Sequence, residues 1–126
     1  MNWNHLRDEA HHDAVAHGWW DNPPEFGTVI ALIQSEASEA LTEARNGHEP
    51  NETYFVCKAT RLPCCHCQPG ACSGRSLKPE GIPYEFADII IRVLDACGQY
   101  GIDINAAIAE KMAFNKTRPY KHGKKF

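Results

Sequence analysis

Residues 85–97 read EFADIIIRVLDAC, and this run decides the fold class. Its apolar residues cover most of a helix circumference, which predicts a helix from about Pro83 to Tyr100 that other helices surround. The same run carries two acids, Glu85 and Asp88, about one helical turn apart. A buried carboxylate without a partner is strongly destabilising or takes up a proton. The run therefore predicts a group beside these acids that neutralises them.

Three more helices are predicted around this one, over residues 1–17, from about Pro24 to Arg45, and from Ile104 to about Lys116. Asp103 is a suitable N-cap for the last of them. Apolar residues recur at spacings of three and four along the second helix, as on the face of an amphipathic helix. They are Phe26, Ile30, Ile33, Ala37, Leu41 and Ala44.

The rest of the chain contains little that predicts a sheet, apart from a short strand-like piece at 54–56. Residues 48–80 hold five of the six cysteines and few aliphatic residues, which indicates an irregular, Cys-rich insertion between helices two and three. We therefore expect an all-α fold, a four-helix bundle within a single domain over residues 1–126.

Composition excludes several classes of protein. The chain has 126 residues, of which 43% are hydrophobic and 23% charged, so it is globular rather than disordered. The longest apolar run, Val29 to Ile33, is far shorter than the ~20 residues of a membrane span. The polar N-terminus lacks the apolar core of a secretory signal, so we expect a cytoplasmic protein without a membrane partner.

Charge is unevenly distributed along the chain. Residues 1–110 carry all 16 acids and 7 bases, whereas the last sixteen residues carry six bases and no acid. An acidic body with a basic tail over residues 119–126 is suited to bind cations and phosphates together. The alternative is a helical domain with a solvated tail, and charge alone does not choose between the two.

Two pairs of acids carry the candidate chemistry. Glu36 and Glu39 share a face of the second helix, as Glu85 and Asp88 do on the third. If the pairs face each other, their oxygens form a site for hard cations. The absence of histidine from both pairs favours Mg²⁺ or Mn²⁺ over iron. The alternative interpretation is a set of solvated acids on exposed faces.

Four motifs follow one another along the chain: GWWD (18–21), LIQSEASEAL (32–41), EFADI (85–89) and KMAFNKTRPY (111–120). In this order they resemble the MazG-like nucleoside triphosphate pyrophosphohydrolases, a superfamily of all-α enzymes. The resemblance covers about residues 13–47 and 80–123, and Ser35 stands where the family pattern often has a further glutamate. The two acid pairs are also separated by a longer segment than is usual in the family.

The resemblance implies a MazG-like bundle that forms a homodimer or homotetramer. It also implies Mg²⁺-dependent cleavage of an NTP or dNTP to the monophosphate and pyrophosphate. Under this resemblance the metal ligands and catalytic residues are Glu36, Glu39, Glu85 and Asp88.

Candidate substrate-binding residues lie near both ends of the chain. Lys111, Asn115 and Arg118 match the family's phosphate-side motif, share a helix face, and have Lys121 as a helper. Trp19 and Trp20 offer ring faces on which a nucleobase stacks, although paired tryptophans at a helix turn also serve as packing anchors. His17 adds a hydrogen-bonding group beside them.

The cysteines of the insertion allow three interpretations. Cys64-x-x-Cys67 with Cys57 and Cys72 has the composition of a structural Zn²⁺ site, in which His66 is a substitute ligand. A plain reduced loop and a disulfide or redox-sensing segment are the others. Cys97 is expected to be a small buried side chain.

Two functions rival the hydrolase. One is a zinc-stabilised module that binds nucleic acid or protein, although the acidic body makes nucleic acid a poor partner. The other is a catalytically silent nucleotide sensor of the same fold, which Ser35 in place of an acid keeps open.

Overall fold

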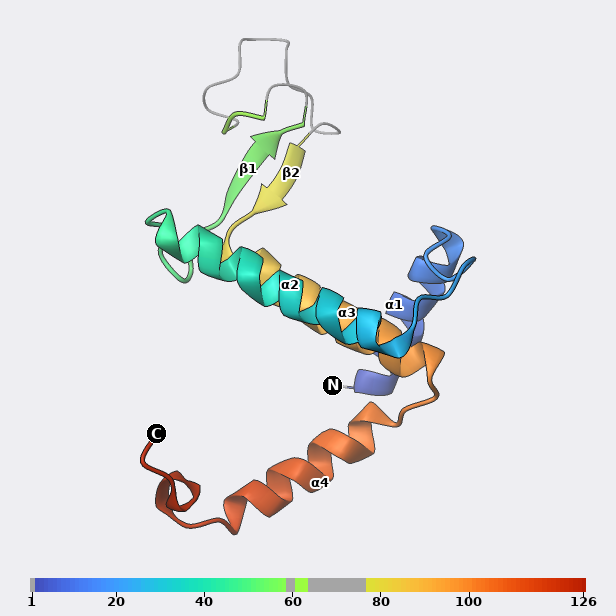
Figure 1. Cartoon of the computed structure of the whole chain (residues 1–126), viewed down its shortest axis with the longest axis vertical. Helices are drawn as coiled ribbons and strands as arrows, with labels where there is room; N and C mark the ends of the chain where they lie inside the picture. The colour runs from blue at the N-terminus through green and yellow to red at the C-terminus, as the bar shows by residue number, and fades with distance from the viewer. Residues whose placement is uncertain (1, 59–60, 64–76) are drawn as a thin grey trace. The chain divides into compact units, whose positions relative to one another are not determined.

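The computed structural model describes residues 2–58, 61–63 and 77–126 (Figure 1). Four α-helices dominate these residues, so the prediction of an all-α fold is confirmed at that level. The elements, in chain order, are α1 (Trp3–Ala16), α2 (Phe26–Arg45), β1 (Tyr54–Cys57), β2 (Leu77–Glu80), α3 (Ile82–Gln99), α4 (Ile104–Lys116) and the 3₁₀ turn η3 (Tyr120–Gly123).

The chain divides into two compact units. The first comprises residues 1–23 and 93–126, and the second comprises residues 24–92. Helix α3 continues through the boundary, so its acids Glu85 and Asp88 belong to the second unit together with α2 and the strand pair.

The second unit contains a strand pair, of which the sequence predicted only the first strand. β1 and β2 are antiparallel, with Tyr54 opposite Glu80 and Cys57 opposite Leu77. The sequence LKPE of β2 contains a proline, which removes a backbone donor and argued against a strand. Proline is tolerated here because the sheet has two strands and both are edges. Gly81 then links β2 directly to α3.

The buried faces of α2 and α3 differ from the faces that their apolar patterns favoured. Along α2 the buried residues are Val29, Glu36 and Ala40, whereas Phe26, Ile30 and Leu41 are 55%, 41% and 58% exposed. On α3, the expectation of a helix surrounded by others is wrong for Phe86, Ile90 and Ile91, which are about half exposed. The physical reason is that the acid-bearing faces of the two helices meet, which turns the longer apolar side chains outward.

The first unit joins α1 to the end of α3 and to α4. His11 Nδ1 and Trp20 Nε1 both lie 2.8 Å from Asp95 Oδ1. A Cβ at Gly98 would lie 2.4 Å from the His11 Cβ, so glycine is needed for this close approach. Asp103 caps α4 by accepting a hydrogen bond from the Ala106 backbone N–H, as predicted.

No helix in the described part of the chain has both the length and the hydropathy that crossing a membrane requires.

Candidate metal centre

Helix α2 supplies a line of acids to the second unit. Glu36, Glu39 and Glu43 follow at spacings of three and four, which places them on one helix face. Glu36 is buried, Glu43 is partly buried and Glu39 is exposed. The buried residues of α2 are therefore Glu36 together with the apolar Val29 and Ala40, and the other two acids continue the same face toward solvent.

Carboxylates of α2 and α3 converge. Glu36, Glu39 and Glu85 each offer an oxygen within 4.8 Å of the others, and we call them the first triad. Three of the four predicted metal ligands are thus brought together. Asp88 lies one turn after Glu85, is exposed and does not belong to this group, although the charge of Glu36 acts on it.

The two glutamates of α2 titrate in opposite directions. Burial pushes the pKa of Glu36 upward, but its hydrogen bonds with Glu39 and Arg92 outweigh burial and lower it. Arg92 Nε donates to Glu36 Oε1 from the next turns of α3. The pKa of Glu39 is raised by its hydrogen bond with Glu36, by burial and by neighbouring charges. The pair is therefore organised around an ionised Glu36.

Glu85 is the least compensated acid of the centre. Its residue is 8% exposed, and within residues 2–58, 61–63 and 77–126 its carboxylate has no hydrogen bond or ion pair. Burial, followed by the charges of Glu39, Glu80, Asp88 and Glu36, raises its pKa to about 7. Partial desolvation of its carboxylate, followed by the charge of Glu36, raises the pKa of Asp88. An all-oxygen donor set on a largely buried residue without an ionic partner fits a hard divalent cation, which would neutralise it.

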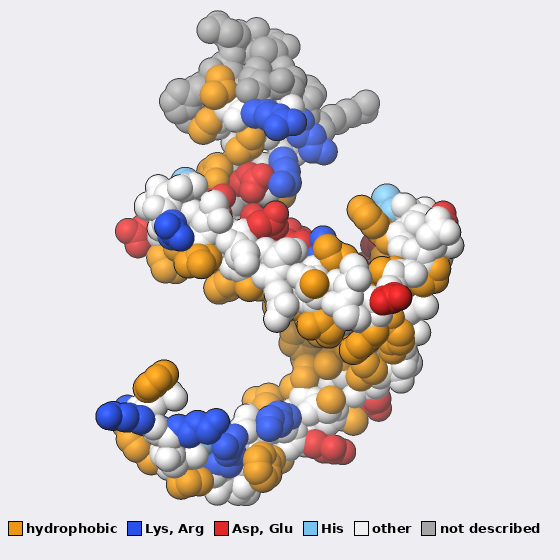
Figure 2. Space-filling view, viewed as in Figure 1, with side chains coloured by type: hydrophobic (Ala, Val, Ile, Leu, Met, Phe, Trp, Pro, Cys, Tyr) orange, Lys and Arg blue, Asp and Glu red, His pale blue; other side chains and the backbone are white. Residues whose placement is uncertain are grey.

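Charged residues that were not predicted as site residues also lie near the first triad. Glu43, Glu80 and Glu85 form a second group with oxygens within 4.8 Å of one another, which we call the second triad. Lys78 Nζ lies 2.8 Å from Glu80 Oε1. Figure 2 shows acidic and basic side chains gathered between α2 and the strand pair.

One of these additional charged residues, Glu43, could have been identified from the sequence. Glu43 follows Glu39 by four residues, so helical spacing alone places it on the acid face. Glu80 and Lys78 could not be identified in this way. They lie near the acids only because β2 pairs with β1, and no local sequence pattern predicts that pairing.

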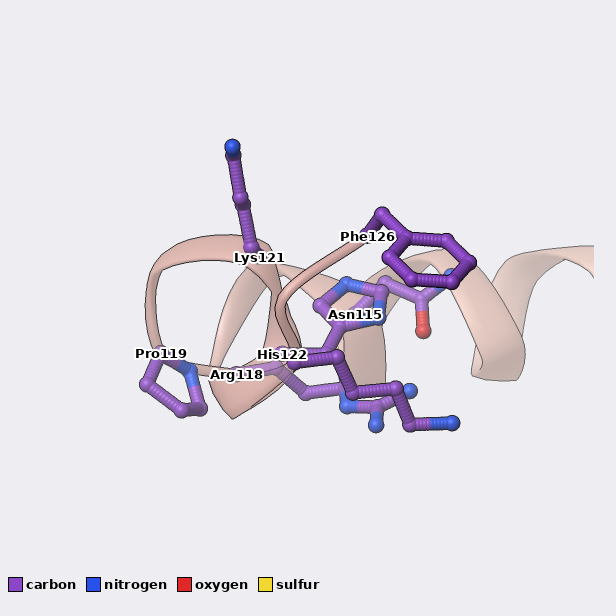
Figure 3. A pocket seen from close by; sticks show the side chains of 7 residues that line it. Asn115, Arg118, Pro119, Lys121, His122 and Phe126 are labelled. Carbon is purple, nitrogen blue, oxygen red and sulfur yellow. The ribbon is translucent and has the colours of Figure 1, made fainter.

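The predicted phosphate-binding residues belong to the first unit. Asn115, Arg118 and Lys121 line a hollow of about 510 Å³, and Lys111 lies outside it. Figure 3 shows Asn115, Arg118 and His122 around one space, with Lys121 pointing away from them. The other lining residues are Pro119, Lys124 and Phe126.

The Phe114 ring makes cation–π contacts with two of these cationic side chains. Lys111 Nζ lies 5.3 Å from the centre of its ring, and the Arg118 guanidinium carbon lies 5.6 Å from it. Both cationic side chains therefore lie beside the Phe114 ring.

The predicted base-contacting residues have different surroundings. Trp19 is 74% exposed. Trp20 donates to Asp95 and contacts His11 and Tyr100 edge to face, which is the packing-anchor alternative. His17 is exposed, and its Nδ1 lies 2.7 Å from the Asp13 backbone oxygen.

The zinc prediction falls mostly outside the described residues. Cys64, His66, Cys67 and Cys72 all lie there. Cys57 is fully buried at the end of β1, and Cys97 is buried in α3 as expected.

No protein-family model, no curated protein and no solved structure matches the chain.

Proposed function

We propose that the chain is a Mg²⁺-dependent nucleoside triphosphate pyrophosphohydrolase, with Mn²⁺ as a substitute ion. It would cleave an NTP or dNTP to the monophosphate and pyrophosphate. The observation that carries the proposal is the convergence of Glu85, a residue only 8% exposed and without an ionic partner among the described residues, with Glu36 and Glu39. An ionised acid in such a position is destabilising, and a bound cation or a bound proton relieves this cost.

The donor set supports the type of ion. Glu36, Glu39 and Glu85 offer only carboxylate oxygens, with Asp88 one turn away on α3. When bound, a divalent ion supplies positive charge that offsets the phosphates of the nucleotide and favours an attacking water. Without that charge, the acids would repel a triphosphate.

The side chains then have distinct roles. Arg92 holds Glu36 by one oxygen, which fixes the orientation of this ligand. Glu36 and Glu39 are the groups that we propose to orient the attacking water. Water attacks the α-phosphorus, the bond between this phosphorus and its bridging oxygen breaks, and pyrophosphate leaves.

The cationic end of α4 supports recognition of phosphate. Arg118 presents a planar fork for bidentate contact and Lys111 presents a point charge, both beside Phe114. Lys121 and Asn115 line the adjoining hollow. We propose that these residues bind the phosphates and that the exposed Trp19 stacks on the base. Arg118→Ala should raise the KM for the nucleotide roughly 10-fold or more, the effect of losing a charge-assisted contact.

The exposed apolar faces support a MazG-like homodimer or homotetramer. Leu41 on α2 and Phe86 on α3 are each more than half exposed, and Figure 2 shows hydrophobic side chains along the edge of α2 away from the strand pair. Contiguous apolar surface of this kind marks protein–protein contact. In an assembly these faces would complete a four-helix core that one chain leaves open.

The proposal is tested with a panel of NTPs and dNTPs plus Mg²⁺ and identification of the products. Monophosphate and pyrophosphate in equal amounts are expected. Orthophosphate as the sole anion released would contradict attack at the α-phosphorus. Glu49→Gln is the matched control, since Glu49 is an exposed acid of the same unit outside both triads.

The same panel, together with measurements of nucleotide binding and zinc content, separates the two rival functions. A silent nucleotide sensor would bind a nucleotide in a Mg²⁺-dependent manner and release no product. A zinc-stabilised module would contain stoichiometric zinc and bind its macromolecular partner in a salt-sensitive manner, without hydrolysis.

A further inference from the structure

One face of the strand pair is directed toward the acids of α2. Glu80 of β2 lies opposite Tyr54 of β1, and residues that lie directly opposite share a face of a sheet. The Tyr54 hydroxyl donates to Glu43 of α2, with its oxygen 2.8 Å from Glu43 Oε2. Lys78 stands two residues before Glu80 on β2, so it lies on this same face, on the α2 side of the strand pair.

Lys78 brings a positive charge to the acids. Its Nζ lies 2.8 Å from Glu80 Oε1, and an oxygen of Glu80 lies within 4.8 Å of an oxygen of Glu85. The ammonium is therefore one carboxylate away from a proposed metal ligand. The hydrogen bond with Glu80 raises the pKa of Lys78, so the side chain is charged at neutral pH. Its charge also acts on the carboxylates of Glu36 and Glu39.

The Lys78 ammonium has room for a ligand. It carries three N–H donors, and in the part of the chain that the structure describes its ion-pair partner is Glu80 alone. The Lys78 side chain is 59% exposed, whereas that of Glu80 is 18% exposed. An ion pair this exposed contributes little to stability, so replacing Lys78 should leave the fold intact.

Glu85 joins two groups of acids, and Lys78 belongs with the second. Glu85 meets Glu36 and Glu39 in the first triad, and it meets Glu80 in the second. In-line attack on phosphorus places the leaving oxygen opposite the attacking water. A nucleotide whose water is held by Glu36 and Glu39 therefore directs its leaving phosphates away from these two acids.

We propose that Lys78 binds the β- and γ-phosphates of the nucleotide, the part that leaves as pyrophosphate. This inference rests on the proposed function, which assigns the metal to the first triad and the water to Glu36 and Glu39. It adds a phosphate-binding residue from the strand pair, in the same unit as the first triad.

The role of Lys78 is electrostatic. One N–H remains on Glu80, and another donates to a non-bridging phosphate oxygen. The ammonium transfers no proton: when the bond from the α-phosphorus breaks, the electron pair stays on the bridging oxygen of pyrophosphate, and Lys78 offsets the charge that develops there. Without this cation, the acids of the second triad would repel the leaving phosphates.

The test compares Lys78→Ala with Lys58→Ala, a control at an exposed lysine directly after β1. Cleavage is measured with the panel of nucleotides and Mg²⁺, and binding is measured by calorimetry with their α,β-imido analogues, which cannot be cleaved at that bond. Lys78→Ala should weaken analogue binding about 10-fold and lower kcat/KM at least as much, the effect of losing a charge-assisted contact. Lys78→Arg should recover most of this loss, and Lys58→Ala should match the wild type.

Two further measurements separate phosphate binding from structural support of the acids. Affinity for the nucleoside monophosphate should be equal in the wild type and Lys78→Ala, because this ligand lacks the β- and γ-phosphates. Affinity for Mn²⁺ without nucleotide should not fall, because removing one cation from a group of acids does not weaken the binding of another. Parallel losses of Mn²⁺, monophosphate and analogue affinity would show a structural role and overturn the proposal.

The outcomes distinguish this proposal from the proposed function. Cleavage by the wild type with equal constants for Lys78→Ala and Lys58→Ala would overturn the role of Lys78 alone. Analogue binding without cleavage would contradict the hydrolase, and a selective loss of that binding in Lys78→Ala would still support the phosphate contact. Neither binding nor cleavage by the wild type would overturn both. If circular dichroism shows that Lys78→Ala does not fold, Lys78→Met, which keeps an apolar stem, carries the same expectation.

Discussion

The inner and outer faces of α2 and α3 differ in an unusual way. Glu36 and Glu85 are more than nine-tenths buried, as is Ala40, while Leu41 and Phe86 on the outer faces are more than half exposed. Burying an acid is costly unless its charge is offset, and contiguous exposed apolar surface is typical of protein–protein contact. We therefore test the inner face for a cation and the outer face for a protein partner.

The largest effect is expected from removing charge on the inner face. Glu39→Gln and Asp88→Asn should each lower turnover roughly 10³-fold, because each removes an anionic group from the proposed metal centre. Initial rates of pyrophosphate release measure this, and circular dichroism should show unchanged helix content. Full activity in both variants would remove the carboxylates from the mechanism, with Glu49→Gln as the neutral comparison.

The next effect concerns the stability of the metal-free protein. The pKa of Glu85 is raised from 4.5 to about 7 in the folded chain, so between these values the folded state holds a proton that the unfolded state releases. Its stabilising contribution is present below pH 4.5 and is lost as pH rises to 7, by roughly 3 kcal/mol at most.

Urea unfolding in EDTA across this pH range measures the loss. Glu85→Gln should remove this part of the pH dependence, and it should make the metal-free chain more stable than wild type at pH 7. A wild-type curve that parallels that of the variant would show that Glu85 is not stressed by burial. Saturating Mg²⁺ should stabilise the wild type and not the variant.

A smaller effect is expected on the outer face. Leu41→Glu should weaken association of the chains by about 1.5–3 kcal/mol, the contribution of one fully buried leucine. Sedimentation velocity would then show a shift toward monomer. Gln34→Glu, an exposed polar position on the same helix, is the control and should leave the assembly unchanged. Identical sedimentation of Leu41→Glu and wild type would exclude this face as the contact.

The smallest effect tests how the strand pair is attached to the inner face. Tyr54→Phe removes the hydroxyl that donates to Glu43, and should lower the free energy of unfolding by about 1.5 kcal/mol. Thermal unfolding measures the change. Phe55 is about half exposed on the same strand, so Phe55→Leu is a matched control that should have less effect.

Sequence alone determined the local part of this picture. Helix positions follow from apolar spacing, caps and glycine stops, as at Asp103 and Gly47, because these are interactions between near neighbours in the chain. The spacing of three between Glu36 and Glu39, and between Glu85 and Asp88, likewise sets which acids share a helix face.

Only the tertiary structure decided which faces meet. The apolar spacing along α2 predicted that its apolar stripe is the buried face. In the structure the face that carries Glu36 is buried instead. Glu80 and Lys78 reach the acids through strand pairing between residues far apart in the sequence, beside a proline that argued against a strand. Helical periodicity predicts which residues share a face of one helix. Which faces of different elements contact each other depends on the packing of the whole chain.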